Sequence, residues 1–472
     1  MMRKISIIYP PISLKERYSS DIGNSGGRQI PLGIYYLASF MRSKNYDVQV
    51  IDAEARNLTT EDILEQIGQF APDYVGISST TVAFHRALET ATAIKNMSPS
   101  PLIVLGGPHV TSNFKHAMSF PVFDYAVLGE GEISLFELCE ALSSEKLLSS
   151  VEGIAYRDIS EGLIRTQSRK YIENLDDLPF PAYDLIPDIN VYNPPPSNYK
   201  ELPVISVITS RGCPGQCTFC DKNVFGDLYR KRSAENVFEE IAMLKKQYNV
   251  KEISFVDDTF LIDKQRVRVL FSMLKEANLF VHWTCMSRVN DVDEEYLRFL
   301  KDNGCWHISL GIESGDQDIL KLIKKNLSLD KVRQVVDWCH KFSIKTKGFF
   351  MLGHPSETEG TVEKTIRFAL SLKLDDAVTT INTPIPGSPQ YAQVFQYGTL
   401  DETNWAEYNY WRPVFIPNGL TSEYLTLKHK EFYRRFYLRP RVLLRYFLSF
   451  FGRGGLRRLF ALMKTSLFLL RK

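Results

Sequence analysis

Three cysteines on one short loop are the residues of this sequence best suited to redox chemistry. Cys213, Cys217 and Cys220 lie within residues 210–221 with the spacing C-x3-C-x2-C, directly after a β-branched run. Three thiolates on a tight loop can hold three irons of a cubane and leave the fourth iron open to a ligand. The sequence therefore predicts a 4Fe-4S cluster with one reactive iron.

A structural zinc site is the alternative for these cysteines. Structural zinc takes four ligands, usually from two CxxC or CxxH pairs, and this sequence holds no second pair. The remaining cysteines are scattered singly, and each is expected to be a small buried apolar residue: Cys139, Cys285, Cys305 and Cys339. The cluster is the preferred interpretation.

The cysteine spacing, with the aromatic Phe219 just before the last cysteine, resembles the signature of the radical S-adenosylmethionine (radical SAM) enzymes. In that family the amino and carboxylate groups of S-adenosylmethionine chelate the open iron. Segments 348–358 and 383–389 also resemble strand ends of this family, so the resemblance covers residues 3–390. It implies S-adenosylmethionine as a cofactor and a reductant such as flavodoxin or ferredoxin.

The second half of the chain contains the elements that must position the cysteine loop. Strand-like runs alternate with helical patterns, at residues 204–209, 252–257, 281–287, 307–312, 345–352 and 377–382. This alternation predicts a parallel β/α barrel, complete or partial, with its chemistry at the carboxyl ends of the strands. The cysteine loop follows the first of these strands.

Charged residues end three of the later strands. Asp257 and Asp258 follow the second, Arg288 the third and Glu313 the fourth. A carboxylate can accept hydrogen bonds from ribose hydroxyls or an ammonium, and a guanidinium can bind the methionine carboxylate. These four, with Phe219, are predicted to contact S-adenosylmethionine. Solvated strand ends or internal ion pairs are the alternative, and no catalytic residue is assigned beyond the cluster and cofactors.

The first half alternates five short apolar runs with amphipathic stretches, which predicts a doubly wound parallel sheet of the α/β class, with a Rossmann-like topology. The runs are residues 4–9, 46–52, 73–78, 102–107 and 125–129. Ligands of such sheets bind beyond the carboxyl ends of the strands. Small and polar residues gather there: Ser78, Ser79, Thr80, Gly106, Gly107, His109, Gly129, Glu130 and Gly131.

These loops, with the opening segment 30–38, resemble the cobalamin-binding domain found ahead of many radical SAM domains. The resemblance implies that a corrinoid lies across the sheet edge on these loop residues. The Asp-x-His-x-x-Gly motif that supplies a cobalt ligand is absent, so we expect cobalt without a protein histidine and His109 as a local hydrogen-bonding residue. A flavodoxin-like module that lost its ligand or binds a nucleotide is the alternative, although no G-x-G-x-x-G follows the first strand.

Four segments are predicted: a cobalamin-binding domain (1–145), a linker (146–202), a radical SAM barrel with the cluster (203–392), and a C-terminal cap with a basic tail (393–472). A short hairpin is expected within residues 153–165. The resemblance implies methylation of an unactivated carbon through a 5′-deoxyadenosyl radical. The alternatives are non-methylating radical chemistry, such as ring closure of a magnesium-protoporphyrin ester, and a non-catalytic cluster or corrinoid sensor.

The tail differs in charge from the rest of the chain. Residues 434–472 hold nine Arg, two Lys and no acid, which leaves 46 basic and 55 acidic residues before them. Apolar clusters alternate with these arginines, a pattern typical of helices that lie on a membrane surface. We expect peripheral membrane contact and a small-molecule or lipid-like substrate. Docking on the acidic body is the alternative, and no nucleic-acid motif accompanies the basic run.

Cysteine usage bears on the compartment. Seven cysteines without disulfide-like spacing, and no signal peptide at the start, predict a reducing cytoplasm. Together with the basic tail, these features predict a cytoplasmic protein that binds peripherally to the inner face of the membrane.

Overall fold

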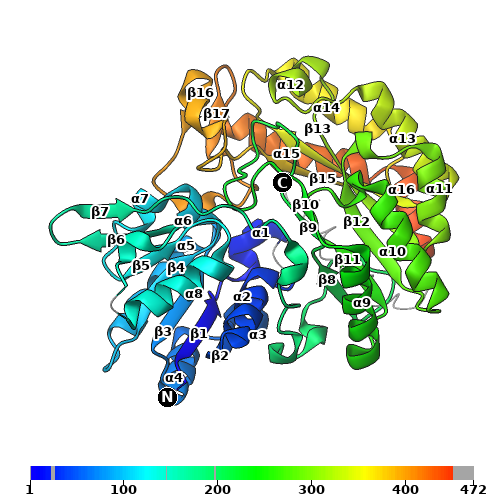
Figure 1. Ribbon diagram of the computed structural model, residues 1–472. Helices are drawn as coiled ribbons and strands as arrows, with labels where there is room; N and C mark the ends of the chain where they lie inside the picture. The colour runs from blue at the N-terminus through cyan, green and yellow to red at the C-terminus, as the bar shows by residue number, and fades with distance from the viewer. Residues whose placement is uncertain (1, 23–26, 145, 196–197, 450–472) are drawn as a thin grey trace.

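The computed structural model describes residues 2–22, 27–144, 146–195 and 198–449. Two sheets lie side by side, each flanked by helices, and the C-terminal elements bridge them (Figure 1). The predicted tail falls partly outside this range, because residues 450–472 are not among the described residues.

The first sheet has the strand order β2-β1-β3-β4-β5-β6-β7. Its first five strands are parallel and alternate with helices, as the apolar runs predicted, and the order turns back at β1, as in doubly wound folds. The strands are β1 (Lys4–Tyr9), β2 (Asp47–Asp52), β3 (Tyr74–Ser78), β4 (Leu102–Gly106), β5 (Tyr125–Val127), β6 (Ile154–Asp158) and β7 (Gly162–Arg165). The helices are α1 (Leu14–Ile22), α2 (Leu32–Ser43), α3 (Ala53–Arg56), α4 (Thr60–Phe70), α5 (Phe84–Lys95), α6 (Pro108–Ser112), α7 (Phe114–Ala117) and α8 (Gly131–Leu142).

The predicted hairpin is present, but it belongs to the first sheet. Its strands β6 and β7 are antiparallel, and β6 pairs with β5. Residues 154–165, which the sequence assigned to the linker, therefore extend the first sheet, because the edge of β5 leaves backbone groups that the hairpin can pair. The connector proper begins after Arg165.

The second sheet is parallel throughout and has the order β15-β14-β13-β12-β11-β8. Its edge strands β15 and β8 do not pair with each other, so the barrel is open. The sequence had allowed either a complete or a partial barrel, and the partial form is present. The strands are β8 (Val204–Val207), β11 (Glu252–Phe255), β12 (His282–Ser287), β13 (Cys305–Glu313), β14 (Lys345–Leu352) and β15 (Asp376–Ile381). The helices are α9 (Ala234–Tyr248), α10 (Lys264–Glu276), α11 (Glu294–Asp302), α12 (Gln317–Leu322), α13 (Leu329–Lys341) and α14 (Glu359–Ser371).

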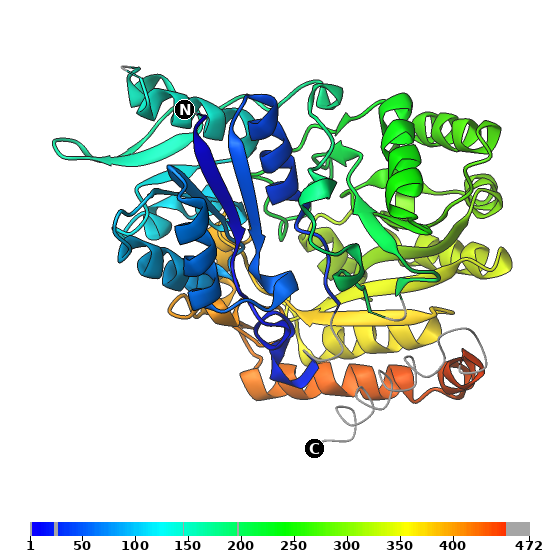
Figure 2. The same cartoon turned by 90° about the horizontal axis from the view of Figure 1, so that it is seen from below.

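The C-terminal cap closes the exposed edge of the second sheet. It comprises β16 (Gly398–Leu400), β17 (Phe415–Pro417), α15 (Ser422–Tyr437) and α16 (Pro440–Ser449). Helix α15 runs along the edge strand β15 (Figure 2), and the imidazole of His429 contacts the Thr379 carbonyl at 2.9 Å. The cap thus hides an edge that would otherwise offer unpaired backbone groups.

A continuous apolar core joins the two sheets. It runs from Ile5 and Tyr35 of the first sheet and its helix, through Tyr183 of the connector, to Ile241 on α9. The connector is also pinned by polar contacts, since the Tyr183 hydroxyl donates to Glu240 at 2.7 Å. The two domains therefore pack as one body.

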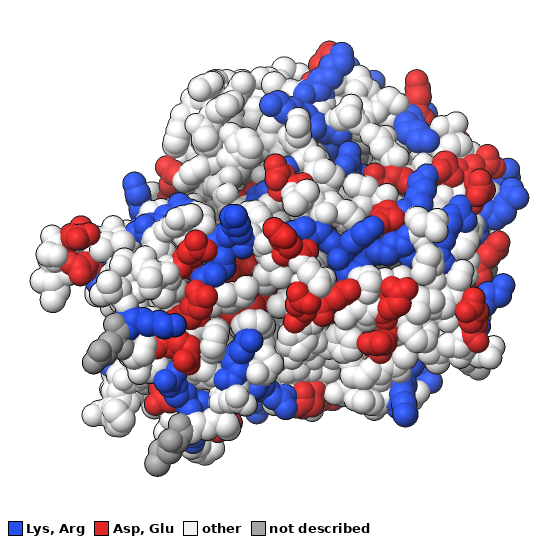
Figure 3. Space-filling view, viewed as in Figure 1, with Lys and Arg blue, Asp and Glu red and all other residues white. Residues whose placement is uncertain are grey.

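Surface charge is mixed on the face seen in Figure 1. Acidic and basic side chains are interspersed over it, with a run of Lys and Arg over the barrel on the right (Figure 3). The excess of acid in the body inferred from the sequence does not gather into one acidic field on this face.

Candidate functional site at the facing ends of the two sheets

The cysteine loop (residues 212–229) is held at its base and from both sides. At the base, β9 (Ser210–Arg211) pairs with β10 (Arg230–Lys231). Within the loop, the backbone N–H of Thr218 donates to the Ile323 carbonyl at 3.0 Å. The backbone N–H of Gln390 donates to the Thr218 carbonyl at 2.8 Å. The loops that follow the fourth and sixth barrel strands therefore fix the cysteine backbone.

Gly212 begins this loop in a conformation that other residues avoid. Its φ is +86°, and an added Cβ would lie 2.2 Å from the Leu228 carbonyl oxygen. Only glycine allows so close an approach of two backbone segments. The glycine of the motif is thus a steric requirement of the closed loop.

The three loop cysteines are half-buried, and their thiols differ in acidity. The pKa of Cys217 falls to about 6, because Cys220 donates a hydrogen bond to its sulfur and the Lys325 ammonium lies near. The pKa of Cys220 rises in return. Burial raises the pKa of Cys213. Thiolates are the ligands that iron requires, so this donor set fits an iron–sulfur cluster.

Lys325, which sequence reasoning missed, sits beside the thiols and is paired with Glu313. Its Nζ lies 2.8 Å from Glu313 Oε1, and both side chains are nearly buried. An added Cβ on Gly311 would lie 2.7 Å from Glu313 Oε1, so glycine makes room for the pair. Lys325 follows another lysine after α12, and no spacing rule marked it as functional.

Arg288 places a guanidinium that is unpaired among the described residues near the cysteine loop. Within the described part of the chain its side chain makes no hydrogen bond and no salt bridge. Its Nη1 lies 3.9 Å from the position that a Cβ on Gly215, between Cys213 and Cys217, would take. An unpaired guanidinium beside the thiols is suited to bind a carboxylate.

The two neighbouring aspartates have different environments. Asp257 is fully buried, and it accepts hydrogen bonds from Thr209 Oγ1 at 2.7 Å and from Ser210 Oγ. Asp258 is exposed and makes no hydrogen bond or ion pair with any described residue. Asp257 therefore anchors the entry into the cysteine loop, and Asp258 keeps a free carboxylate.

Buried polar groups without partners gather near the cysteine loop. Among the described residues, Asn382 Oδ1 and both side-chain amide atoms of Gln390 lack hydrogen-bond partners, and both ring nitrogens of His354 are buried. The ring of Phe219 lies 6.2 Å from that of His354, and burial lowers the pKa of His354 to about 4. An unsatisfied buried polar group costs about 1–3 kcal/mol. These groups fit a polar ligand such as S-adenosylmethionine, and the sequence did not single them out.

The carboxyl edge of the first sheet exposes backbone. An added Cβ on Gly106 would meet nothing within 4 Å. Gly107 has a φ of +97°, and its Cβ would lie 2.8 Å from the amide nitrogen of Ser79, so β3 and β4 end in close contact. Thr80 Oγ1 is buried without a partner. An open glycine face with a free hydroxyl fits the close approach of a bulky, amide-bearing ligand such as a corrinoid.

His109 is held in a chain of hydrogen bonds that reaches the cap. Because indole only donates, Trp405 Nε1 donates to His116 Nε2 at 3.1 Å, which leaves His116 Nδ1 to donate to His109 Nε2 at 3.4 Å. His109 Nδ1 then donates to Thr81 Oγ1 at 3.3 Å. Burial lowers the pKa of His109 to about 3. His109 thus takes part in a local network of hydrogen bonds.

The acidic loop after β5 connects the two domains. Glu130 is buried, and its carboxylate lies 2.7 Å from Arg211 and 2.9 Å from Arg230. Glu132 lies 2.6 Å from Arg211. Both arginines belong to the strands that close the cysteine loop. The Glu130 carboxylate, predicted as a cobalamin contact, is thus occupied within the protein, because it and Glu132 together neutralise the two buried guanidinium groups.

The glycines that flank Glu130 have separate constraints. Gly129 has a φ of +80°, and its added Cβ would meet only the Asn223 carbonyl oxygen, at 4.0 Å. An added Cβ on Gly131 would lie 3.0 Å from Leu37 Cδ2, so this glycine allows α8 to pack on α2. Gly129 stays near open space, whereas Gly131 is a packing position.

Comparison with known proteins identifies the class of protein to which this site belongs. The B12 binding domain family matches residues 19–138, and the Radical SAM superfamily matches residues 207–369. The first match contains strands β2 to β5, and the second contains strands β11 to β14 together with the cysteine loop. The protein is a radical SAM enzyme with a cobalamin-binding domain.

Two relatives have sequences similar to this chain over most of its length. An uncharacterized methyltransferase of Pyrococcus horikoshii is 37% identical over 447 residues, 94% of each chain. The chain therefore belongs to the same family. An anaerobic magnesium-protoporphyrin IX monomethyl ester cyclase of Rubrivivax gelatinosus is 28% identical, over 88% of this chain and 76% of the cyclase.

A solved structure shares the fold. The radical S-adenosylmethionine methyltransferase TsrM from Kitasatospora setae, with cobalamin and a [4Fe-4S] cluster bound, has a TM-score of 0.67 and 17% identity. The match covers 84% of this chain and 75% of that chain. The predicted α/β architecture, a doubly wound domain followed by a partial barrel, is confirmed.

Proposed function

We propose that this enzyme methylates an unactivated carbon of its substrate, using a 4Fe-4S cluster, S-adenosylmethionine and cobalamin. The observation that carries the proposal is the meeting of the three-cysteine loop with the unpaired Arg288 and with the first domain, through Glu130 and Arg230. When bound, the cluster, S-adenosylmethionine and cobalamin supply a 5′-deoxyadenosyl radical and a transferable methyl group. The relative from Pyrococcus horikoshii, described as a methyltransferase, supports this activity.

The barrel residues bind and orient in this proposal. Cys213, Cys217 and Cys220 hold the cluster. Arg288 binds the methionine carboxylate of S-adenosylmethionine, and Asp258 accepts from its ammonium or ribose. Glu313 holds the Lys325 ammonium in place beside the thiolates. Phe219 lies against the adenosine. A reductant such as flavodoxin or ferredoxin supplies the electron.

The first domain binds the corrinoid in this proposal. Ser78, Ser79, Thr80 and the glycines Gly106, Gly107 and Gly129 form the contact edge, and Glu130, Gly131 and His109 support it from behind. We place the cobalamin-binding domain at residues 1–145, the linker at 146–202, the barrel at 203–392 and the cap and tail at 393–472, with the hairpin packed on the first domain.

Substitution of Cys217 by alanine tests the proposal. The protein is reconstituted anaerobically with iron, sulfide and cobalamin, and then given dithionite and methyl-labelled S-adenosylmethionine. Cys217→Ala is expected to abolish 5′-deoxyadenosine formation, and Cys339→Ala, a buried cysteine on α13, is expected to leave it intact. Retained cleavage in Cys217→Ala with an unchanged fold would contradict the assignment.

Non-methylating ring closure is the second candidate, favoured by the similarity to the cyclase of Rubrivivax gelatinosus. Either reaction would start from the cofactors proposed here, so the two candidates are told apart by the product. A gain of one labelled methyl group supports methylation, and ring formation without label supports the cyclase-type reaction. A sensor would give neither nucleoside product although cluster and cobalamin were bound.

We also propose that the C-terminal segment contacts a membrane surface. Helix α16 exposes 50% of Leu443 and 58% of Leu444, and residues 434–472 carry eleven basic groups. None of the described helices is long and apolar enough to cross a bilayer. A chain ending at Tyr437 should lose binding to anionic vesicles; if it still pelleted with them, the tail would not be the contact.

A further inference from the structure

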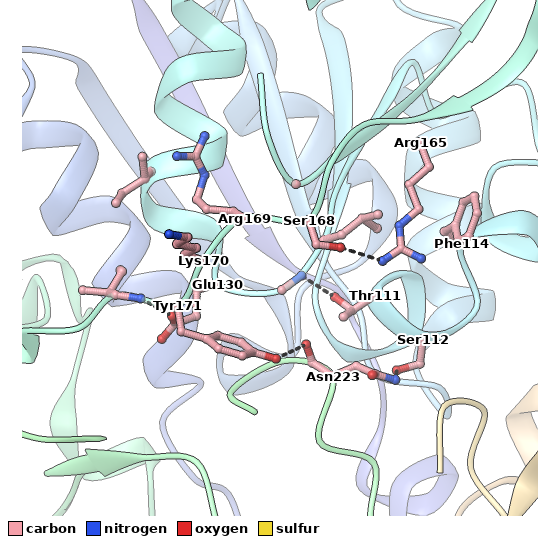
Figure 4. Close-up of a pocket in the computed structure, with 15 residues that line it drawn as sticks. Thr111, Ser112, Phe114, Glu130, Arg165, Ser168, Arg169, Lys170, Tyr171 and Asn223 are labelled. Atoms are coloured by element: carbon pink, nitrogen blue, oxygen red, sulfur yellow. Dashed lines mark hydrogen bonds between the residues drawn. The ribbon is translucent and has the colours of Figure 1, made fainter. Parts of the chain in front are cut away.

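A cavity of about 250 Å³ lies where the connector crosses the carboxyl edge of the first sheet (Figure 4). We name it the connector pocket. Its walls come from α6, from the loop after β5 and from connector residues 168–172, and Asn223 of the cysteine loop forms part of its lining. Gly106 and Thr80 do not line the pocket, whereas Gly129, which follows β5, does.

Two cations of the connector pocket have no acidic partner among the described residues. Arg165 Nη2 donates to Ser168 Oγ at 3.2 Å, and its guanidinium lies 5.3 Å from the ring centroid of Phe114. Lys170 makes no hydrogen bond or ion pair with any residue that the structure describes. Both side chains are exposed toward solvent and line the cavity.

The other charges of the wall are already neutralised. Arg169 is paired with Glu137 and donates from Nε to Ser134 Oγ at 2.9 Å. The carboxylate of the wall, Glu130, is compensated by Arg211 and Arg230. The uncompensated charge in the pocket is therefore that of Arg165 and Lys170, which favours an anionic ligand.

Hydroxyl and amide groups complete the lining. Ser112 Oγ accepts from Asn223 Nδ2 at 3.2 Å and also contacts Asp221. The Tyr171 hydroxyl lies 3.5 Å from the Asn223 carbonyl oxygen. Figure 4 shows the Tyr171 ring lying along the cavity toward Asn223. The pocket thus combines cations, hydroxyls and an aromatic face, and Asn223 comes three residues after Cys220.

We propose that the connector pocket binds a phosphate-like anionic group of the substrate. This inference rests on the proposed function and assigns that substrate an anionic substituent near the cysteine loop. The volume suits a phosphate-bearing fragment, since pockets for whole drug-sized ligands measure roughly 300–1,000 Å³. A corrinoid exceeds it, and Gly106 and Gly107 of the corrinoid edge lie outside the pocket, although Gly129 forms part of its lining.

Binding of inorganic phosphate tests the proposal. The cobalamin-loaded chain is dialysed to equilibrium against radiolabelled phosphate at low ionic strength. The double variant Arg165→Gln/Lys170→Gln is compared with Lys246→Gln, which removes an exposed cation of α9 that does not line the pocket. We expect saturable binding of one phosphate per chain, weakened roughly tenfold or more in the double variant and unchanged in Lys246→Gln.

Two further readouts separate this proposal from its alternatives. The double variant should keep its cobalamin absorption spectrum and its 5′-deoxyadenosine formation, because neither residue contacts the thiols or the glycine face. Loss of cobalamin from the double variant would assign the pocket to the phosphate of the cofactor and overturn the proposal. No saturable phosphate binding, or equal binding by the double variant, would also overturn it. Failure of S-adenosylmethionine cleavage in the wild type would instead reject the proposed function.

Discussion

The loops at the carboxyl ends of the two sheets meet, but their charged groups differ in whether they are paired within the protein. At the end of the first sheet, Glu130, Glu132 and His109 are buried and bonded within the protein. At the mouth of the barrel, Arg288 and Asp258 keep ionic groups without partners among the described residues. Outside the connector pocket, the first edge therefore offers backbone and shape to a ligand, and the second offers charge.

The difference follows from the ligands that the two edges fit. A corrinoid is large and carries amides, so an open glycine face and hydroxyls suffice for it. S-adenosylmethionine carries a carboxylate and an ammonium, which need complementary charges. The buried acids of the first edge serve another purpose, because they hold the two strands that close the cysteine loop.

The largest effect on stability is expected from Arg211→Ala. Glu132 then has no partner while it remains buried, and breaking a buried ion pair costs about 3–5 kcal/mol. Urea unfolding measures the loss. Lys321→Ala removes an ion pair whose side chains are 72% and 90% exposed, and should cost no more than about 0.5 kcal/mol. A loss below about 1 kcal/mol for Arg211→Ala would mean that the acidic loop does not hold the cysteine loop.

The neighbouring aspartates provide the next test. Asp257→Asn turns an amide donor toward the Thr209 and Ser210 donors, and should cost about 2–4 kcal/mol in unfolding free energy. Asp258→Asn should change stability by less than about 0.5 kcal/mol but weaken S-adenosylmethionine binding. Equal destabilisation by the two variants in urea would show that the contrast between the buried and free carboxylates is wrong.

Arg288→Ala should act on binding alone. The variant should raise the Kd for S-adenosylmethionine at least about tenfold, since a charge-assisted pair contributes roughly 1.5–3 kcal/mol. Its unfolding midpoint should stay close to that of the wild type, because the guanidinium makes no hydrogen bond or salt bridge with any described residue. Arg288→Lys should recover binding only in part, since an ammonium lacks the planar fork of donors. Unchanged affinity in both variants would remove Arg288 from the site.

The smallest effect concerns pH. The pKa of His109 is about 3 in the folded protein and about 6.5 in an unfolded chain, so the unfolded state binds more protons below pH 6.5. Stability is therefore lost as the pH falls, by up to about 1.4 kcal/mol per pH unit for this group. His109→Gln should flatten the dependence between pH 7 and pH 5, as followed by urea unfolding. An unchanged slope would show that His109 does not stay neutral in the folded protein.

The sequence by itself determined the strands, their order in the chain and the three cysteines, because these depend on local patterns. Short apolar runs and the C-x3-C-x2-C spacing are local, and the runs of the first half are strands β1 to β5 of the structure. Arg288 and Asp258 could be proposed from their position alone, since parallel strands place their carboxyl ends at one edge.

Tertiary structure decided which of these charged residues remain free. Asp257 and Asp258 are adjacent in sequence, but only the contacts from Thr209 and Ser210 occupy Asp257. The pairing of Lys325 with Glu313 joins residues on different elements, and that of Glu130 with Arg230 spans 100 positions. No local pattern contains such pairs, because the first forms only once the barrel has folded and the second only once the two domains have packed together.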